Sequence, residues 1–302
     1  MKHDHEVPAL SDRSAPKHKH ILSAHDFPEA DIQKLFEFAD KAKTALNAGK
    51  GFNLMPGRTL ATLFYDPSTR TRPSMEVAMA KLGGALISVE NARNSTNDIR
   101  GESLEDVIRS VSAYVDAIAL RHPEPGAAVR ASKVASCPIL NCSDGNNESP
   151  IQALQDLYTI QRLRPDAQTL MFVGDISNSP VVSSLAHFAN VFDLHIFYTG
   201  TFRPSQLPPG RHTSISEANL GSYINQADVL YLLGNRPGGT SKFKLTLDYA
   251  SALKETALIL HPFPRGKELP VEIDADPRAG YFEQSRNGLF IRMAVLNYVL
   301  GR

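Results

Sequence analysis

Residues 60–72 read Leu60-Ala61-Thr62-Leu63-Phe64-Tyr65-Asp66-Pro67-Ser68-Thr69-Arg70-Thr71-Arg72. The apolar first half predicts a buried strand, which a tight turn around Pro67 ends. Apolar residues then recur at the spacing i, i+3, i+4 and i+7, which predicts an amphipathic helix over residues 74–82; they are Met75, Ala78, Met79 and Leu82. We therefore expect a strand, a turn and a helix in succession, with Ser68 and Thr69 at the helix N-cap.

The turn has the chemistry of an anion site. A helix N-terminus leaves backbone N–H groups unpaired, and these attract negative charge. Ser68, Thr69 and Thr71 add hydroxyl donors, and the guanidinium of Arg70 can bind two oxygens of one anion. The turn therefore predicts a site for a phosphate-sized dianion. The alternative is an ordinary capped helix whose arginines, Arg70 and Arg72, face solvent.

Composition favours an enzyme that acts on small molecules. The chain of 302 residues is long enough for two domains, and its 32 basic and 32 acidic residues leave no net charge. Neither nucleic acid nor a membrane surface is therefore expected as a partner. Cys137 and Cys142 lie in an apolar stretch and are expected to be buried thiols rather than metal ligands, in a reducing, cytoplasmic compartment. No signal-like or long apolar segment is present.

Two α/β domains are expected. Residues 1–18 are polar and aperiodic, which predicts a disordered tail. Apolar runs that read as strands then alternate with helical patterns, at residues 59–65, 85–89, 116–121, 138–142, 169–174, 194–198, 229–233 and 257–260. This predicts two doubly wound parallel sheets, in domains at residues 19–150 and 151–283, with a bridging helix at 149–163 and a last helix at 284–300.

The phosphate-type turn also resembles a known signature. Phe64 with Ser68, Thr69, Arg70 and Thr71 is similar to the carbamoyl phosphate motif of the aspartate and ornithine carbamoyltransferases, and later stretches match the aspartate branch in order up to Leu300. The resemblance implies a carbamoyl phosphate domain, an amino-acid domain and a C-terminal helix, 284–302, that packs back on the first domain. It also implies a homotrimer with shared active sites, a small amine acceptor, a place in pyrimidine biosynthesis, and no metal or cofactor.

Three more stretches resemble donor-site elements of this family. By resemblance, Arg121 contacts the carbamoyl oxygen and Gln152 holds the carbamoyl NH2, while the backbone carbonyls of Pro262 and Phe263 accept from that same NH2. A loop at residues 94–103 resembles the segment that a neighbouring subunit inserts into the site, with Thr96 and Arg100 at the contacting positions.

The expected mechanism follows from the chemistry of a mixed anhydride. An amine attacks the carbamoyl carbon, negative charge develops on the carbonyl oxygen, and phosphate leaves. Arg70, Thr71 and Arg121 are the expected catalytic residues: Thr71 and Arg121 stabilise that oxygen, and Arg70 holds the leaving phosphate with Ser68 and Thr69.

Several family positions are altered. Ser149 stands where the family has an active-site His, Arg100 where it has Lys, Thr96 where it has Ser, and Asp66 where the aspartate branch has Glu. The loss of one donor to a developing oxyanion costs about 3–4 kcal/mol. We therefore expect a slow enzyme unless Ser149 reaches the oxygen through a water molecule.

The acceptor positions differ further. Pro180 and Gly234 stand where the family has arginines that bind the carboxylates of aspartate. Two missing charge-assisted contacts predict aspartate binding weaker by about two to four powers of ten. Arg236, Lys242 and Lys244 are candidates for a replacement site; the alternative for all three is a solvent-facing, charged loop.

Two functions remain open from the sequence. The first is a carbamoyltransferase that acts on aspartate or on another amine, and the second is a non-catalytic paralogue that serves as a structural or regulatory partner. The retained donor residues, Arg121 and Gln152 among them, favour the transferase, because a scaffold has no chemical need for them. Ornithine is less attractive as the acceptor, since no Cys stands in the loop at Phe263.

Overall fold

The computed structural model describes residues 19–90, 101–200, 202–203, 207–234 and 241–301. The predictions for the tail at 1–18 and for Thr96, Arg100 and Arg236 therefore lie outside the described residues.

The first sheet has four parallel strands in the order β2-β1-β3-β4. They are β1 (Thr59–Phe64), β2 (Ala85–Glu90), β3 (Ala117–His122) and β4 (Ile139–Asp144). The helices associated with it are α1 (Glu29–Asn47), α2 (Thr71–Lys81), α4 (Leu104–Ser112) and α5 (Ala127–Ser132). Because β1 pairs with β2 on one side and with β3 on the other, the winding changes direction between β1 and β3, which is where doubly wound sheets bind ligands.

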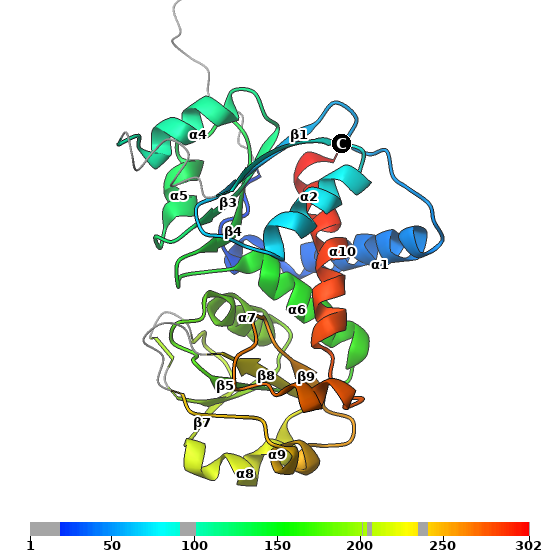
Figure 1. Cartoon of the computed structure of the whole chain (residues 1–302), viewed down its shortest axis with the longest axis vertical. Coiled ribbons are helices and arrows are strands. Elements are labelled where there is room, and N and C mark those ends of the chain that lie inside the picture. The colour runs from blue at the N-terminus through cyan, green and yellow to red at the C-terminus, as the bar shows by residue number, and fades with distance from the viewer. Residues whose placement is uncertain (1–18, 91–100, 201, 204–206, 235–240, 302) are drawn as a thin grey trace, which may run out of the picture.

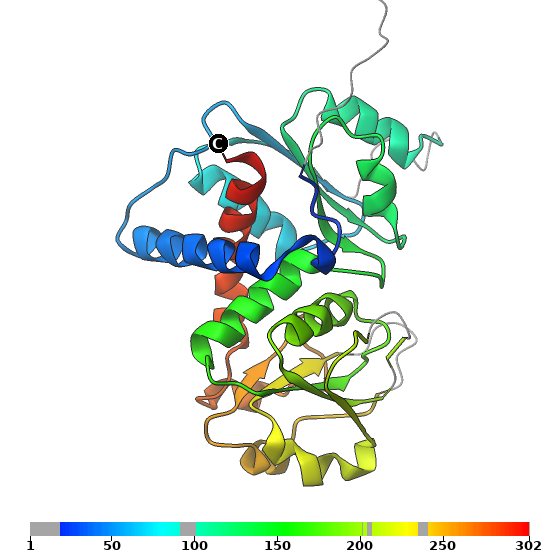
Figure 2. The same ribbon diagram turned by 180° about the vertical axis from the view of Figure 1, so that it is seen from behind.

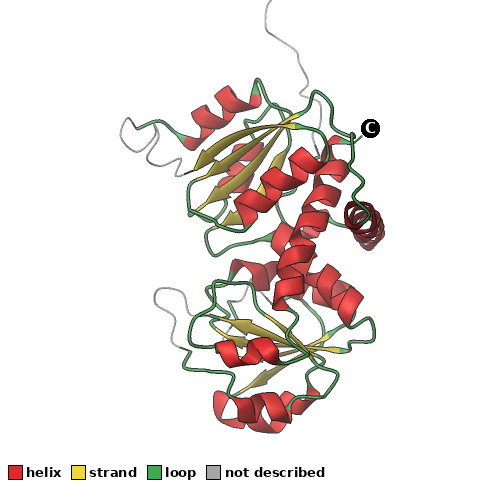
Figure 3. Ribbon diagram, turned by 45° about the vertical axis from the view of Figure 1, so that its right-hand side comes forward, coloured by secondary structure: helices red, strands yellow, loops and turns green. Residues whose placement is uncertain are grey.

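The second sheet has five parallel strands in the order β7-β6-β5-β8-β9. They are β5 (Thr169–Gly174), β6 (His195–Thr199), β7 (His212–Ile215), β8 (Val229–Leu233) and β9 (Leu258–Leu260). Its helices are α7 (Pro180–Val191), α8 (Leu220–Tyr223) and α9 (Leu247–Ala252), and short 3-10 turns lie at Ala24–Asp26, Glu217–Asn219, Ile224–Gln226 and Val271–Ala275. Figure 3 shows helices on both faces of each sheet, so the predicted fold class of two doubly wound α/β units is confirmed.

Two long helices run between the sheets. These are α6 (Pro150–Leu163) and α10 (Tyr281–Leu300), and both lie along the middle of the molecule in Figure 1 and, from behind, in Figure 2. The last helix returns to the first half of the chain, where it packs against α1 and α2 as well as α6. No helix among the described residues is long and apolar enough to cross a membrane.

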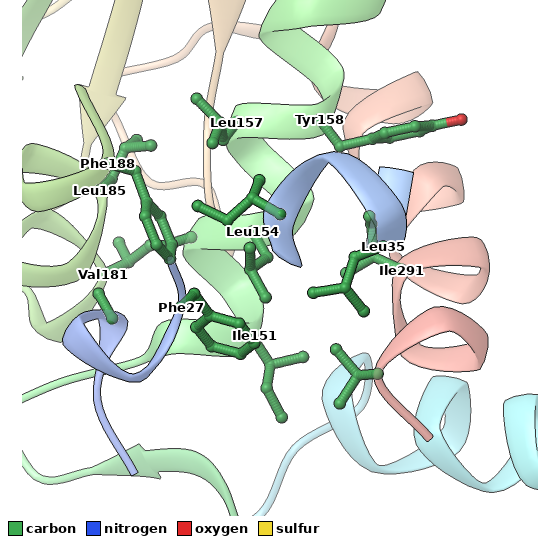
Figure 4. Packing of buried hydrophobic residues seen from close by; sticks show 14 of the residues in the cluster. Phe27, Leu35, Ile151, Leu154, Leu157, Tyr158, Val181, Leu185, Phe188 and Ile291 are labelled. Atoms are coloured by element: carbon green, nitrogen blue, oxygen red, sulfur yellow. The ribbon is translucent and has the colours of Figure 1, made fainter. Parts of the chain in front are cut away.

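The apolar core is continuous across the two halves. Figure 4 shows Phe27, Leu154, Phe188 and Ile291 among the side chains of one cluster, drawn from segments far apart in the sequence. Both cysteines are buried and unbridged, as the sequence predicts. Burial raises the pKa of Cys137 and of Cys142 to about 12, so both are neutral, inert thiols near pH 7.

Candidate functional site

The hydroxyl-rich turn lies between the end of β1 and the start of α2. The helix begins at Thr71 with Arg70 as its N-cap, and Arg70 makes no side-chain capping bond. The prediction that Ser68 and Thr69 occupy the N-cap is therefore wrong by one to two residues. Ser68 still serves the helix end, because its Oγ accepts from the backbone N–H of Thr71 at 3.1 Å.

Arg121 enters the site from the next strand. Phe64 and Arg121 are paired in the parallel register of β1 and β3, so the carboxyl ends of the two strands lie side by side. The Nη1 of Arg121 lies 3.5 Å from the carbonyl oxygen of Cys142, and its buried Nε has no partner in the structure. Donors of this guanidinium are therefore left for an oxygen that is not part of the protein.

The pKa values of both arginines are lowered from the ordinary arginine value. Burial lowers the pKa of Arg121, opposed by the negative charge of Asp66. The pKa of Arg70 is lowered by its partial removal from water and then by the positive charge of Arg121. Both remain cations near pH 7, because the ordinary arginine value is so high. Two like charges held together in this way favour a dianion between them.

A cavity of about 450 Å³, here called the donor cleft, brings together all the residues predicted to hold carbamoyl phosphate. They come from the β1–α2 turn, the end of β3, the start of α6 and the loop after β9, and they are Ser68, Thr69, Arg70, Thr71, Arg121, Gln152, Pro262 and Phe263. Residues nearly 200 positions apart thus line one space. This agrees with the rule that doubly wound sheets bind ligands at the carboxyl ends of their strands.

Sequence reasoning missed a buried carboxylate that holds Gln152. Asp156 is fully buried, and its Oδ1 accepts from the side-chain amides of Gln152 at 2.9 Å and Gln284 at 2.8 Å. Its Oδ2 accepts from the hydroxyl of Tyr231 at 2.5 Å. Burial raises the pKa of Asp156 to about 6, although the hydrogen bonds from Tyr231, Gln284 and Gln152 act to lower it. Because the NH2 of Gln152 is bound to Asp156, its amide oxygen is the end left for a ligand.

The loop after β9 is held by His261. The Nδ1 of His261 accepts from the backbone N–H of Phe263 at 2.9 Å, so in the neutral ring the proton lies on Nε2, which lies 3.0 Å from Oε1 of Glu268. The backbone N–H of His261 donates to Gln284 at 3.0 Å. Phe263 adopts a φ of +52°, which is unusual for a residue with a side chain. These contacts fix the backbone of Pro262 and Phe263 at the cleft.

The opposite wall of the donor cleft lacks a cationic side chain among the described residues. It is formed by Ser149, Ser179, Pro180, Val181, Leu233 and Gly234. Pro180 begins α7, and Gly234 follows the end of β8. Ser149 is buried at the start of α6, where its N–H donates to Ser184 at 3.0 Å.

The lysines predicted for the acceptor lie elsewhere. Lys242 and Lys244 do not line the donor cleft but a neighbouring cavity of about 400 Å³, together with Lys267 and Glu268. Leu233 lines both spaces, so the two are adjacent. No group of three or more His, Cys, Asp or Glu residues that could hold a metal ion occurs in the described parts of the chain.

These features define a class: two-sheet α/β proteins with a hydroxyl- and arginine-lined cleft between their halves. The family model described as the carbamoyl-P binding domain of aspartate/ornithine carbamoyltransferases matches residues 19–162, and that of the Asp/Orn binding domain matches residues 237–299. The chain is 36% identical over 302 residues to the aspartate carbamoyltransferase catalytic subunit of Methanocaldococcus jannaschii, covering 93% of this chain and 98% of that protein.

Other relatives agree. The chloroplastic aspartate carbamoyltransferase of Arabidopsis thaliana is 35% identical over 301 residues, which cover 93% of this chain and 77% of that protein. The aspartate transcarbamoylase of Trypanosoma cruzi in complex with aspartate and phosphate superposes with a TM-score of 0.86 at 32% identity, over 94% of this chain and 96% of that chain. The chain therefore belongs to the aspartate/ornithine carbamoyltransferase family, and it is an enzyme of the carbamoyltransferase class.

Proposed function

We propose that this protein transfers the carbamoyl group of carbamoyl phosphate to the amine of a small acceptor, with aspartate as the first candidate. One observation carries the proposal: a single cleft gathers the turn at Ser68–Thr71, the incompletely paired guanidinium of Arg121 and the oriented amide of Gln152. Relatives named aspartate carbamoyltransferase, and the Trypanosoma cruzi structure with aspartate and phosphate, support the choice of acceptor.

The donor roles follow from the positions of these groups. Ser68, Thr69, Arg70 and Thr71 would bind the phosphate at the N-terminus of α2, where backbone N–H groups favour an anion. The amide oxygen of Gln152 would accept from the carbamoyl NH2, since Asp156 already holds the opposite end of that amide. The backbone carbonyls of Pro262 and Phe263 would accept from the same NH2.

Catalysis would then rest on orientation and charge. The acceptor amine attacks the carbamoyl carbon with its lone pair, the electrons of the C=O bond move onto the oxygen, and Thr71 and Arg121 stabilise that oxygen. When the C=O bond reforms, the C–O bond to phosphate breaks, the proton lost by the amine passes to the departing phosphate oxygen, and Arg70 holds the resulting dianion. Ser149 lines the same cleft, which supports a role in which its hydroxyl would reach the oxygen through a water molecule.

We propose further that the acceptor site is altered. The support is the wall of the cleft at Pro180 and Gly234, neither of which carries a charged side chain. Without compensation, the KM for aspartate is expected to be higher than with two arginines by about two to four powers of ten. Arg236 and Lys242 stay the candidates for a replacement, and Lys242 would have to move from the neighbouring cavity to serve.

The second candidate function is a non-catalytic paralogue that acts as a structural or regulatory partner. The same observations that favour it, Ser149, Pro180 and Gly234 in the cleft, would also fit a transferase with another acceptor. The homotrimer, the contribution of Thr96 and Arg100 from a neighbouring subunit, and the cytoplasmic location stay predictions. Light scattering of the purified protein would test the trimer directly.

The deciding experiment is detection of the carbamoylated product by mass spectrometry. The purified protein is incubated with carbamoyl phosphate and a panel of amines that includes aspartate, with phosphate release followed alongside. Carbamoyl-aspartate is the expected product. A product from another amine alone would support the altered acceptor site, and donor binding without any product would favour the non-catalytic paralogue.

Replacement of Arg70 tests the donor site. Arg70→Ala removes the charge-assisted contacts to phosphate, so binding of carbamoyl phosphate is expected to weaken by about a hundredfold or more, measured by titration calorimetry. Arg109→Ala is the matched control, because Arg109 is exposed and, in the part of the chain that the structure describes, its side chain pairs with Asp106 on its own helix. Equal donor affinity of Arg70→Ala and the wild type would show that the site is assigned wrongly.

A further inference from the structure

A second cavity adjoins the donor cleft. This side chamber has a volume of about 350 Å³ and lies where α2, α6 and α10 meet. It shares six lining residues with the donor cleft, Arg70, Gln152 and Phe263 among them, but Val77, Leu289 and Arg292 line the side chamber alone. None of the roles proposed above for the carbamoyl donor or the acceptor uses these last three residues.

Arg292 is a buried cation with few hydrogen bonds. Its side chain is only 2% exposed, and Gln155, a neutral amide, is its single hydrogen-bond partner in the described structure, at 2.8 Å from Nη1. Its Nε is buried without any partner. Buried charges are normally paired, because their removal from water is costly. The side chamber is therefore lined by a guanidinium whose hydrogen-bonding capacity the protein leaves mostly unused.

The negative charge of Asp156 acts to keep Arg292 charged, but no hydrogen bond joins the two in the described structure. Burial lowers the pKa of Arg292 to about 10, so it is still a cation near pH 7. The thiol of Cys142 is neutral there, and the carboxylate of Asp156 already accepts from Gln152, Gln284 and Tyr231. An anion from solution is thus the natural partner for the unused donors of Arg292.

The last helix makes room for this arrangement. Gly288 lies one turn before Arg292 in α10, and a Cβ atom at Gly288 would lie 2.3 Å from Nη1 of Arg292 and 2.3 Å from Oε1 of Gln155. Glycine inside a helix is unfavourable relative to alanine. This glycine lies at a position where a side chain would displace the guanidinium and its neutral partner.

The rest of the side chamber is apolar enough to hold a hydrocarbon body. Pro73, Val77, Phe263 and Leu289 line it, and Val77 is partly open to solvent. We propose that the side chamber is a second ligand site, which binds a small monocarboxylate with a compact apolar body, the carboxylate on Arg292 and the body against Val77 and Leu289. A ligand there also touches Arg70 and Gln152, so it contacts residues that face the carbamoyl donor.

The test compares a charged probe with its neutral counterpart. Benzoate and benzamide are each titrated into the full-length protein and followed by ligand-observed NMR, and inorganic phosphate is titrated separately to report on the donor cleft. Benzoate is expected to bind at least about tenfold more tightly than benzamide, since one charge-assisted contact is worth about that much. No binding of benzoate, or equal binding of the two probes, would overturn the proposal.

Variants then locate the probe. Arg292→Gln is expected to weaken benzoate by about tenfold or more and to change phosphate affinity by less than about threefold, whereas Arg121→Gln is expected to do the reverse. Arg286→Gln, an exposed neighbour on α10, is the control that should change neither. Equal benzoate binding by Arg292→Gln and the wild type would place the probe elsewhere and reject the site.

A second variant covers the case in which Arg292→Gln does not fold. Val77→Asp puts a negative charge at the partly exposed edge of the side chamber, on a residue that can be changed without opening the core. It is expected to weaken benzoate several-fold while benzamide is unaffected. If these experiments reject the side chamber as a ligand site, the proposed transferase function still stands, because phosphate binding and product formation are measured separately.

Discussion

At the scale of single residues, the most informative group is the fully buried carboxylate of Asp156. Asp156 receives three hydrogen bonds from α6, β8 and α10, so it ties the start of α6 to the second sheet. Its pKa of about 6, above the ordinary 3.8, shows that burial outweighs these donors. A raised pKa means that the contribution of this residue to stability is complete below pH 3.8 and is lost as the pH rises through about 6.

Tyr231→Phe tests this balance. The substitution removes one donor to the ionised Asp156 and is expected to lower the free energy of unfolding by about 1.5–3 kcal/mol at pH 7. Without this donor the pKa of Asp156 rises further. The loss in free energy of unfolding relative to wild type should therefore shrink as the pH falls from 7 to 5, because the carboxyl becomes neutral. Urea unfolding at both pH values measures the difference.

The control for that prediction is Tyr158→Phe. The hydroxyl of Tyr158 donates to Asp40 at 2.7 Å. Burial acts to raise the pKa of Asp40, but hydrogen bonds from Arg162 and Tyr158 lower it overall, so Asp40 stays ionised from pH 5 to 7. The free energy of unfolding that Tyr158→Phe loses should therefore be the same at pH 5 and at pH 7. A deficit of Tyr231→Phe that is equally constant would contradict the role given to Asp156.

The candidate site was predictable where its chemistry is local. Ser68 to Thr71 stand together in the sequence, and the structure places Arg121 beside them because both follow parallel strands. Asp156 and Arg292 were missed because each lies in an apolar helix that sequence periodicity assigns to the core. The signal that points to them is a polar residue on the buried face of such a helix, as with Gln155 and Gln284.

At the scale of elements, strands inside a sheet are easier to predict from the sequence than a strand at the edge of a sheet. All eight predicted strands occur, and the bounds of β5 and β8 match the prediction, since both are apolar strands inside a sheet. The edge strand β7 was missed, because His212, Thr213 and Ser214 give it no apolar run. Its pairing with β6 comes from tertiary structure, which sequence pattern does not contain.

The end of β5 allows only glycine. Gly174 has a φ of +118°, and a Cβ there would lie 2.0 Å from the carbonyl oxygen of Leu233 at the end of β8. Gly174→Ala is therefore expected to lower the free energy of unfolding by at least about 2 kcal/mol, measured by urea denaturation.

A second glycine separates backbone strain from crowding. Gly57 also has a positive φ, +74°, but a Cβ there would have no neighbour within 4 Å. Gly57→Ala should cost only about 1 kcal/mol, the price of the left-handed backbone alone. Equal losses for the two variants would mean that the contact between β5 and β8 is not tight.

At the scale of the whole molecule, the last helix decides whether the first half is stable. Five of the apolar side chains on α10 are almost completely buried: Ile291, Met293, Ala294, Val295 and Leu296. The larger of them contribute about 1.5–3 kcal/mol each when buried, which together is comparable with the net stability of a domain.

A chain that ends at residue 280 tests this dependence. Neither the first nor the second half is expected to fold stably in this shortened chain. Rapid proteolysis of both halves at 25 °C would show this. Removal of Gly301 and Arg302 alone is the control, because Gly301 is exposed beyond the helix. A protease-resistant first half in the shortened chain would show that α10 is dispensable there.

This return of the last helix has a consequence for synthesis on the ribosome. The apolar faces of α1 and α2 emerge early, but their cover, α10, is completed only at Leu300. At ordinary rates of translation, roughly 7–27 s pass between the end of α6 and that point. During this interval the nascent chain carries an uncovered apolar surface, so its yield in a cell should depend on chaperones that shield it until α10 has been made.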